Sequence, residues 1–179
     1  MAGDTGLLLR ALAFAAQRHS RQRRKDVEAS PYINHPIALA NVLANEAGID
    51  SVEVLAAAIL HDTLEDTETT VTELDAAFGP RICRIVLEVT DDKSLPKTVR
   101  KQLQIELAPQ LSHEAKLVKF ADKICNLRDV ATAPPVGWPL ERRQRYFDWA
   151  RQVVDRMRGV HAGLEAIFDA AYARRPGSS

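Results

Sequence analysis

The chain has 179 residues, of which 46% are hydrophobic and only 6% aromatic, and its 24 basic side chains balance its 24 acidic ones. This length favours one compact domain, and an aliphatic, alanine-rich composition is typical of packed helices. A zero net charge argues against a nucleic-acid-binding protein, which usually carries a basic excess. No stretch reaches 18 uninterrupted apolar residues, so we expect no membrane span.

Hydrophobic spacing predicts the first two helices. Leucine and alanine recur at helical spacing over residues 5–20, and the polar segment 21–34 is expected to be a loop. A second helix is predicted over 35–48, because Pro36 suits a first helical turn and Gly48 suits the position after a helix end.

The third and fourth helices have clear start signals. We predict one helix over 51–66, with Ser51 as its cap, and a short helix over 70–79. Thr70 and Glu73 have the spacing of a capping box, in which each side chain bonds the other residue's backbone amide.

The remaining segments also favour helices. Residues 81–92 are rich in β-branched side chains, but they keep helical spacing and no other segment could pair with them as a strand. The segment 134–139 is expected to be a loop, and the tail 174–179 to be frayed. We therefore expect an all-α fold of seven to ten helices in one domain over 1–179. The other predicted helices are 96–108, 114–130 and 140–174, the last broken near Gly159 or Gly163.

Two cysteines, Cys83 and Cys125, are far apart and form no CxxC motif. Two cysteines do not make a disulfide framework in a chain of this length, so free buried thiols in a reducing cytoplasm are expected. The N-terminal apolar run is broken by Arg10 and lacks the features of a signal peptide. We expect a cytoplasmic protein.

The most hydrophobic segment, AAAILHDTLEDT over 56–67, ends in one histidine and three carboxylates. Residues four apart share a helix face, as His61 and Glu65 do, and as Asp62 and Asp66 do. Buried carboxylates without a cationic partner cost several kcal/mol in practice. A metal ion would offset several negative charges at once, so the segment favours a metal site.

Further candidate ligands lie in two other segments. His35 precedes Pro36, and Asp122 should face inward in an amphipathic segment that also carries Asn126 one turn further on. His35, His61, Asp62 and Asp122 would supply two imidazoles and two carboxylates, which suit Mn²⁺, Fe²⁺ or Zn²⁺. Each residue alone has an ordinary explanation, such as a turn or a cap, so the prediction depends on their joint pattern.

A basic run, RHSRQRRK over 18–25, contains no acid. A run of this kind is often a solvated helix end. Its position ten residues before His35 favours contact with an anionic ligand for Arg24 and Lys25. Nucleic-acid binding has little support because the run has no interleaved aromatic residues.

The H…HD…D pattern resembles that of the HD-domain metal-dependent phosphohydrolases, which are all-α proteins. Further motifs are similar to the hydrolase domain of the Rel/Spo alarmone enzymes, and to the small stand-alone hydrolases of that family. The matching motifs are RRK at 23–25, PYINHP at 31–36, ILHDTLEDT at 59–67, FG at 78–79, EVTDDK at 88–93 and KLVKFADKICNLRDV at 116–130.

The resemblance implies Mn²⁺-dependent removal of pyrophosphate from the 3′ position of guanosine tetra- or pentaphosphate, with hydroxide attacking the outer 3′ phosphorus. It also implies that synthesis of the alarmone is absent, because the chain ends where the long enzymes begin a synthetase domain. The resemblance implies the following roles: metal ligands His35, His61, Asp62 and Asp122; catalytic pair Glu65 and Asp66; nucleotide contacts Arg24 and Lys25, with Asn126 near the ribose. Separately from the resemblance, Lys97, Arg142 and Tyr146 are further candidates for nucleotide contact, with surface salt bridges as the alternative.

Two alternatives stay open at this point. The same metal chemistry would serve removal of the 2′-phosphate of NADPH or hydrolysis of another nucleotide. The chain could instead bind metal and nucleotide as a regulator without catalysis, although a binding module has no need of Glu65 and Asp66. The native metal, the oligomeric state and the division of acid and base between these two carboxylates are not determined by the sequence.

Overall fold

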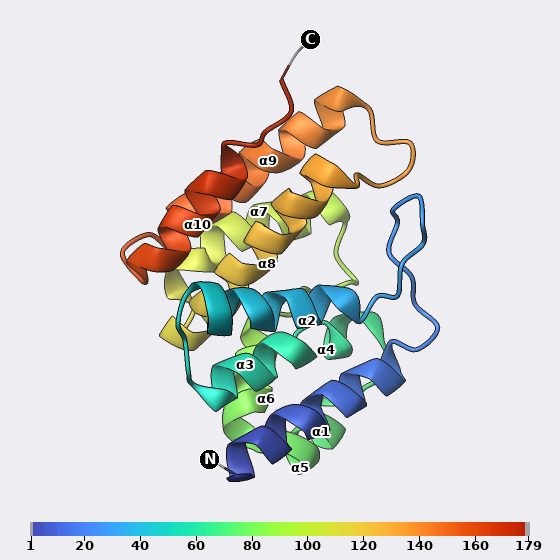
Figure 1. Cartoon of the computed structure of the whole chain (residues 1–179), viewed down its shortest axis with the longest axis vertical. Helices are drawn as coiled ribbons and strands as arrows, with labels where there is room; N and C mark the ends of the chain where they lie inside the picture. Colours follow the sequence, from blue (N-terminus) through green and yellow to red (C-terminus); the bar gives the residue numbers. More distant parts are fainter. Residues whose placement is uncertain (1, 178–179) are drawn as a thin grey trace.

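The computed structural model describes residues 2–177, and the regular elements of this part are all helical (Figure 1). The expected all-α class is therefore confirmed. The α-helices are α1 (Ala2–Arg18), α2 (Asn34–Asn41), α3 (Val52–Leu60), α4 (Thr63–Asp66), α5 (Val71–Phe78), α6 (Pro80–Val89), α7 (Lys97–Leu107), α8 (His113–Thr132), α9 (Leu140–Asp155) and α10 (Ala162–Tyr172), with a π-helical segment η1 (Val42–Glu46) and a 3₁₀ segment η2 (Ala108–Gln110).

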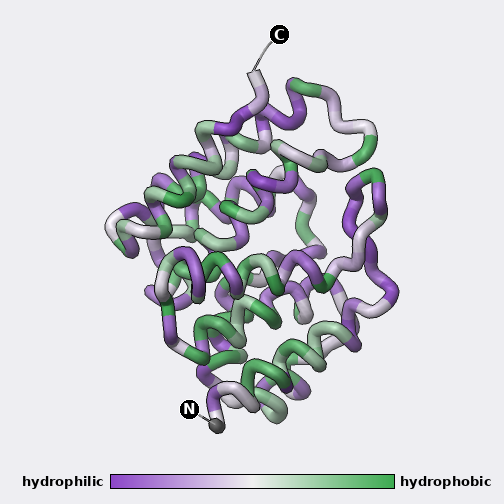
Figure 2. The backbone as a smooth tube through the Cα atoms, in the orientation of Figure 1, coloured by the Kyte–Doolittle hydropathy of each residue, from purple (hydrophilic) through white to green (hydrophobic). Residues whose placement is uncertain are grey.

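Two helices, α3 and α8, form the centre of the molecule. Helix α3 packs against α1, α2 and α6, whereas α8 packs against α2, α6, α9 and α10 (Figure 1). Every residue from Val54 to Leu60 is buried, and hydrophobic colouring follows this helix in Figure 2. The predicted metal-binding segment therefore follows directly on the most apolar helix of the core.

Several local predictions are confirmed. Residues 80–89 are helical despite their β-branched content, and the capping box of Thr70 and Glu73 is formed. The chain breaks between α9 and α10 near Gly159, whose φ of 92° lies in the left-handed region that favours glycine. Both cysteines are free and buried. Across the described residues, no helix has the length and apolarity needed to cross a bilayer.

The prediction of one continuous helix over 51–66 is wrong. Helix α3 ends at Leu60, and Asp62 adopts φ −97° and ψ 0°, a conformation between helix and turn, before α4 begins at Thr63. The Thr63 hydroxyl donates to the Leu60 carbonyl at 2.7 Å and thereby satisfies one carbonyl freed by the break. This break changes the direction in which His61 and Asp62 project.

The second predicted helix also differs from expectation. It starts as an α-helix at Asn34, but over Val42–Glu46 it widens to a π-helix, in which the Ala47 amide bonds the Val42 carbonyl at 2.9 Å. The extra residue keeps Val42 and Leu43 buried.

The prediction of a frayed tail is wrong for Arg175, whose guanidinium makes two hydrogen bonds of 2.8 Å to the Asp148 carboxylate. The predicted fraying of Ser178 and Ser179 concerns positions outside the described residues.

Candidate active site

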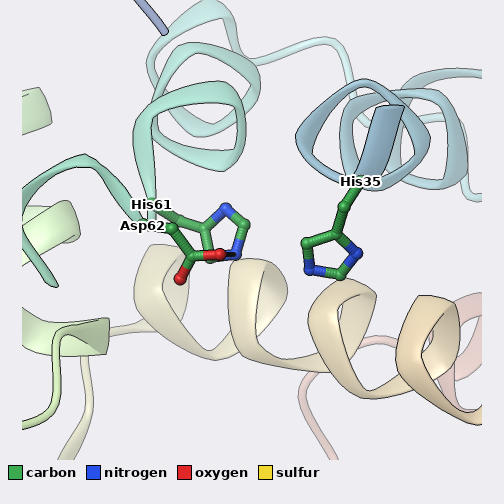
Figure 3. Close-up of side chains that lie close together, drawn as sticks. All are labelled: His35, His61 and Asp62. Carbon is green, nitrogen blue, oxygen red and sulfur yellow. Dashed lines mark ion pairs between the residues drawn. The ribbon is translucent and has the colours of Figure 1, made fainter. Parts of the chain in front are cut away.

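The four predicted metal ligands converge from three separate segments. His35 lies in the first turn of α2, His61 and Asp62 lie at the break between α3 and α4, and Asp122 lies in α8. One ligand atom each of His35, His61 and Asp62 lies within 4.8 Å of the others (Figure 3). Asp122 Oδ1 lies 3.3 Å from His35 Nε2 and 4.0 Å from His61 Nε2, so all four side chains face one small space.

A hydrogen bond to the backbone orients the imidazole of His61 for cation binding. His61 Nδ1 lies 2.9 Å from the Ala58 carbonyl and therefore carries the proton in this bond, which leaves Nε2 as the ligand atom. Within the described part of the chain, Nε2 is buried and makes no hydrogen bond, although Asp62 Oδ2 is only 2.9 Å away. A buried ring nitrogen without a hydrogen-bond partner fits a cation, and two imidazoles with two carboxylates fit a divalent one.

The charges of this cluster depend on one another. Burial lowers the pKa of His61, but the Asp62 and Asp122 carboxylates outweigh burial and raise it to about 9. Burial raises the pKa of Asp62, but the neighbouring histidines outweigh burial and bring this pKa well below its usual range. Burial also raises the pKa of Asp122, and there Lys123 and the histidines lower the pKa well below its usual range. Both carboxylates are therefore ionised, and a bound cation would take the place of the proton on His61 Nε2.

Three neighbours hold the carboxylate ligands in place. The Tyr32 hydroxyl donates to Asp62, Asn126 Nδ2 donates to Asp122 Oδ1 at 2.6 Å, and Lys123 Nζ lies 3.1 Å from Asp122 Oδ2. The sequence prediction missed Tyr32 and Lys123 as site residues, although Tyr32 belongs to the motif PYINHP. Asn126, predicted to lie near a ribose, lines the cleft and also supports this ligand.

The predicted catalytic pair lies beside the ligands. Glu65 Oε2 accepts the Asp91 backbone N–H at 3.1 Å, and Asp66 pairs with Lys93, whose Nζ is also 3.8 Å from Glu65 Oε1. Burial raises the pKa of Glu65, and the Asp91 amide offsets this only in part. A carboxylate with a raised pKa can accept a proton closer to neutral pH. Lys93 was not among the predicted site residues, although it is the last residue of the motif EVTDDK.

Two connected cavities form the cleft. The inner cavity, of about 230 Å³, is lined by the four predicted ligands and by one face of α7 that includes Lys97. The outer cavity, of about 580 Å³, is lined by Arg24 and Lys25 and by apolar residues that include Trp138. Their common wall consists of Arg24, Tyr32, His35, Glu65, Asn126 and Tyr146.

Not every predicted nucleotide contact lies free in this cleft. Arg142 does not line either cavity directly; its guanidinium lies 4.4 Å from the ring centroid of Trp138. Arg24 is held by an ion pair with Asp129 and stacks 5.7 Å above the Tyr32 ring centroid. A ligand in the outer cavity would therefore meet Arg24 in a fixed position.

The combination of an H…HD…D ligand set with an all-α scaffold defines the class of this protein. The family described as HD domain matches residues 11–146, and the chain belongs to this family.

Relatives with more specific names match almost the whole chain. The Danio rerio protein named guanosine-3′,5′-bis(diphosphate) 3′-pyrophosphohydrolase MESH1 is 52% identical over 172 residues, which are 96% of each chain. The Homo sapiens protein of the same name is 51% identical over 175 residues, 98% of each chain. A solved structure described as a metazoan ortholog of SpoT that hydrolyzes ppGpp and plays a role in starvation responses superposes with a TM-score of 0.91 at 48% identity, covering 94% of this chain and 95% of that one.

Proposed function

We propose that the chain, over 1–179, is one hydrolase domain that removes pyrophosphate from the 3′ position of guanosine tetra- or pentaphosphate and releases GDP or GTP. The observation that carries this proposal is the convergence of His35, His61, Asp62 and Asp122 on one small space, with Glu65 beside it. The names of the MESH1 relatives supply the substrate.

The four converging side chains would hold the cation, for which Mn²⁺ is proposed and Fe²⁺ or Zn²⁺ would fit the same donors. When bound, a divalent cation lowers the pKa of water and polarises a phosphate oxygen. The residues of the chain do the rest of the chemistry: they orient the nucleotide, receive the proton and balance the charge of the phosphates.

The products determine which phosphorus is attacked. Pyrophosphate leaves intact only if the water oxygen bonds to the inner phosphorus, the one esterified to the ribose, and the bond from this phosphorus to O3′ breaks. Attack on the outer phosphorus, as expected from the sequence, would release orthophosphate and leave a 3′-monophosphate, so that expectation is wrong for this reaction. The attacking water loses one proton, and O3′ gains one.

Glu65 and Asp66 are proposed to move these protons. Glu65 faces the inner cavity and has a raised pKa, so it can accept a proton from water and later release it. Lys93 lies beside both carboxylates and keeps a positive charge near the pair.

The nucleotide is proposed to occupy the outer cavity. Its apolar lining, which includes Ala38, Val130 and Trp138, suits a base and a sugar. Arg24, Lys25 and Lys97 line the cleft and would offset the phosphate charge, with Asn126 beside the ribose and Arg142 held against Trp138 at the margin. The free cysteines fit the proposed cytoplasmic location.

A product assay tests the proposal. Guanosine tetraphosphate incubated with the protein and Mn²⁺ should give GDP and pyrophosphate in equal amounts, and chelation of the metal should stop the reaction. NADPH is assayed in parallel for release of orthophosphate. Turnover of NADPH alone would overturn the proposed substrate, and binding of guanosine tetraphosphate without any turnover would support the regulator instead.

A further inference from the structure

The inner cavity has an end that the proposed nucleotide site does not use. Beyond Lys97, one face of α7 lines this end with Arg100, Lys101 and Gln104, and Trp149 of α9 also lines it. At about 230 Å³ the cavity is smaller than those that hold drug-sized ligands. Its volume therefore suits a small anion but not a second nucleoside.

The lysines of this end differ in their partners. Lys119 Nζ donates to the Val89 carbonyl at 3.1 Å, and Lys123 Nζ lies 3.1 Å from Asp122 Oδ2, so both already have oxygen partners. Lys101 Nζ lies 4.4 Å from the ring centroid of Trp149, as Lys123 Nζ also does, and 5.4 Å from that of Tyr146. Within residues 3–177, no carboxylate lies within ion-pair distance of Lys101.

Arg100 is only weakly paired. Its nearest carboxylate oxygen, Glu65 Oε1, is 3.7 Å from a terminal guanidinium nitrogen, and its Nε is buried with no hydrogen-bond partner among the described residues. Buried polar groups of proteins nearly always have partners. An anion between Arg100 and Lys101 would provide one for both side chains.

Burial and the nearby cations Lys97, Lys123 and Arg142 lower the pKa of Lys101 to about 8. The ammonium group is therefore still mostly protonated at neutral pH, and a bound anion would relieve its repulsion from these neighbours.

We propose that Arg100 and Lys101, with the Trp149 indole as the supporting wall, bind the outer phosphate of the 3′-pyrophosphate and make the enzyme selective for a 3′-diphosphate over a 3′-monophosphate. This inference rests on the proposed function, because the inner phosphate must lie among the ligands for the outer one to reach α7. The same pair would retain pyrophosphate after the bond to O3′ breaks.

The test compares two nucleotides that differ by this one phosphate. Turnover of guanosine tetraphosphate is measured with guanosine 5′-diphosphate 3′-monophosphate as a competitor, in wild type and in Lys101→Met, which keeps an unbranched apolar stem on Trp149. We expect kcat/KM for the tetraphosphate to fall roughly 10- to 100-fold, the loss for one hydrogen bond to a charged group. The inhibition constant of the monophosphate should change less than about threefold, and that of pyrophosphate should rise by the same factor by which kcat/KM falls.

Two further variants separate charge from packing. Lys101→Arg restores the charge and should recover most of the selectivity. Lys116→Met makes the same substitution on a lysine outside both cavities, and it should change neither kcat/KM for the tetraphosphate nor the inhibition constant of the monophosphate. This inference alone would be overturned if Lys101→Met weakened the binding of the 3′-monophosphate by the same factor by which it lowered kcat/KM for the tetraphosphate. It would also be overturned if the substitution changed neither value. Absence of wild-type turnover of the tetraphosphate would overturn the proposed function, and this inference with it.

Discussion

The two ring nitrogens of His61 have different surroundings, and this difference determines how the ring can bind a cation. Nδ1 is used in the bond to Ala58, whereas Nε2 faces Asp62 and Asp122. The Ala58 carbonyl is available because α3 ends at Leu60 and leaves its last carbonyls without helical partners. The end of the helix therefore fixes the tautomer of the ligand.

Glu65→Gln is the sharpest test at the scale of a residue. The amide keeps the size of the side chain and its contact with the Asp91 amide but cannot accept a proton. We expect the bound metal to be retained and kcat to fall roughly 10²- to 10⁴-fold, the usual contribution of a general base. The metal content of the variant is measured together with its rate. Loss of the bound metal would indicate that Glu65 is a metal ligand and not a general base.

Lys93→Met tests the charge beside the catalytic pair. Burial already raises the pKa of Glu65, and loss of the cation 3.8 Å away should raise it further. A base acts only when ionised, so activity is lost as pH falls through its pKa. The acid limb of the profile of kcat/KM against pH should therefore move to higher pH in this variant. An unchanged limb in Lys93→Met would show that Glu65 is not the titrating group.

Candidate ligands such as His61 and Asp62 could be picked out from the sequence because the signal is local: a histidine and three carboxylates interrupt an apolar run. The roles of Tyr32, Lys93 and Lys101 could not, because each depends on a partner distant in the sequence. Tyr32 meets Asp62 from 30 positions away, and Lys101 meets Trp149 from 48. Tertiary packing, which the spacing of residues does not encode, brings these pairs together.

At the scale of the element, helix ends were predicted better than helix interruptions. The cap at Ser51 and the capping box at Thr70 are local hydrogen-bond patterns, so a few residues specify them. The break at Asp62 occurs in a run with good helical spacing, and tertiary contacts of its side chain override that spacing. The Tyr32 hydroxyl, 30 positions away in the sequence, donates to the Asp62 carboxylate.

Thr70→Ala tests the capping box of α5. The variant loses the bond from the Glu73 amide to the Thr70 hydroxyl, now 3.2 Å long, and should lower the free energy of unfolding by about 1 kcal/mol. Thr72→Ala, on the exposed side of the same helix, is the matched control and should be neutral or slightly stabilising. Urea unfolding of both variants measures the difference, and equal midpoints would contradict the assigned cap.

At the scale of the whole molecule, the site joins parts of the chain that are far apart. The proposed ligands come from α2, the break after α3, and α8, which all meet at the centre of the fold (Figure 1). A cation bound there would link these helices in the folded state only. Binding of the cation is therefore expected to raise the free energy of unfolding of the whole domain.

Metal removal tests this coupling. At a free Mn²⁺ concentration of about 100 times the dissociation constant, binding should add about 2.7 kcal/mol to the free energy of unfolding. For a chain of this size, that corresponds to a rise in Tm of roughly 5–10 °C. Asp62→Ala should lose both the bound metal and the rise in Tm. A metal-dependent rise that persists in this variant would place the cation elsewhere.

The π-helical segment Val42–Glu46 follows α2 directly, so its length determines which way the side chains of α2 point relative to the rest of the fold. Each residue of a helix turns the chain by about 100°, so removing one residue there would swing His35 about the helix axis by that angle. The imidazole would then leave the proposed ligand cluster while the chain after Ala44 kept its place in the fold. An Ala44 deletion that folds but binds no manganese would show that the length of this short segment is itself part of the metal site.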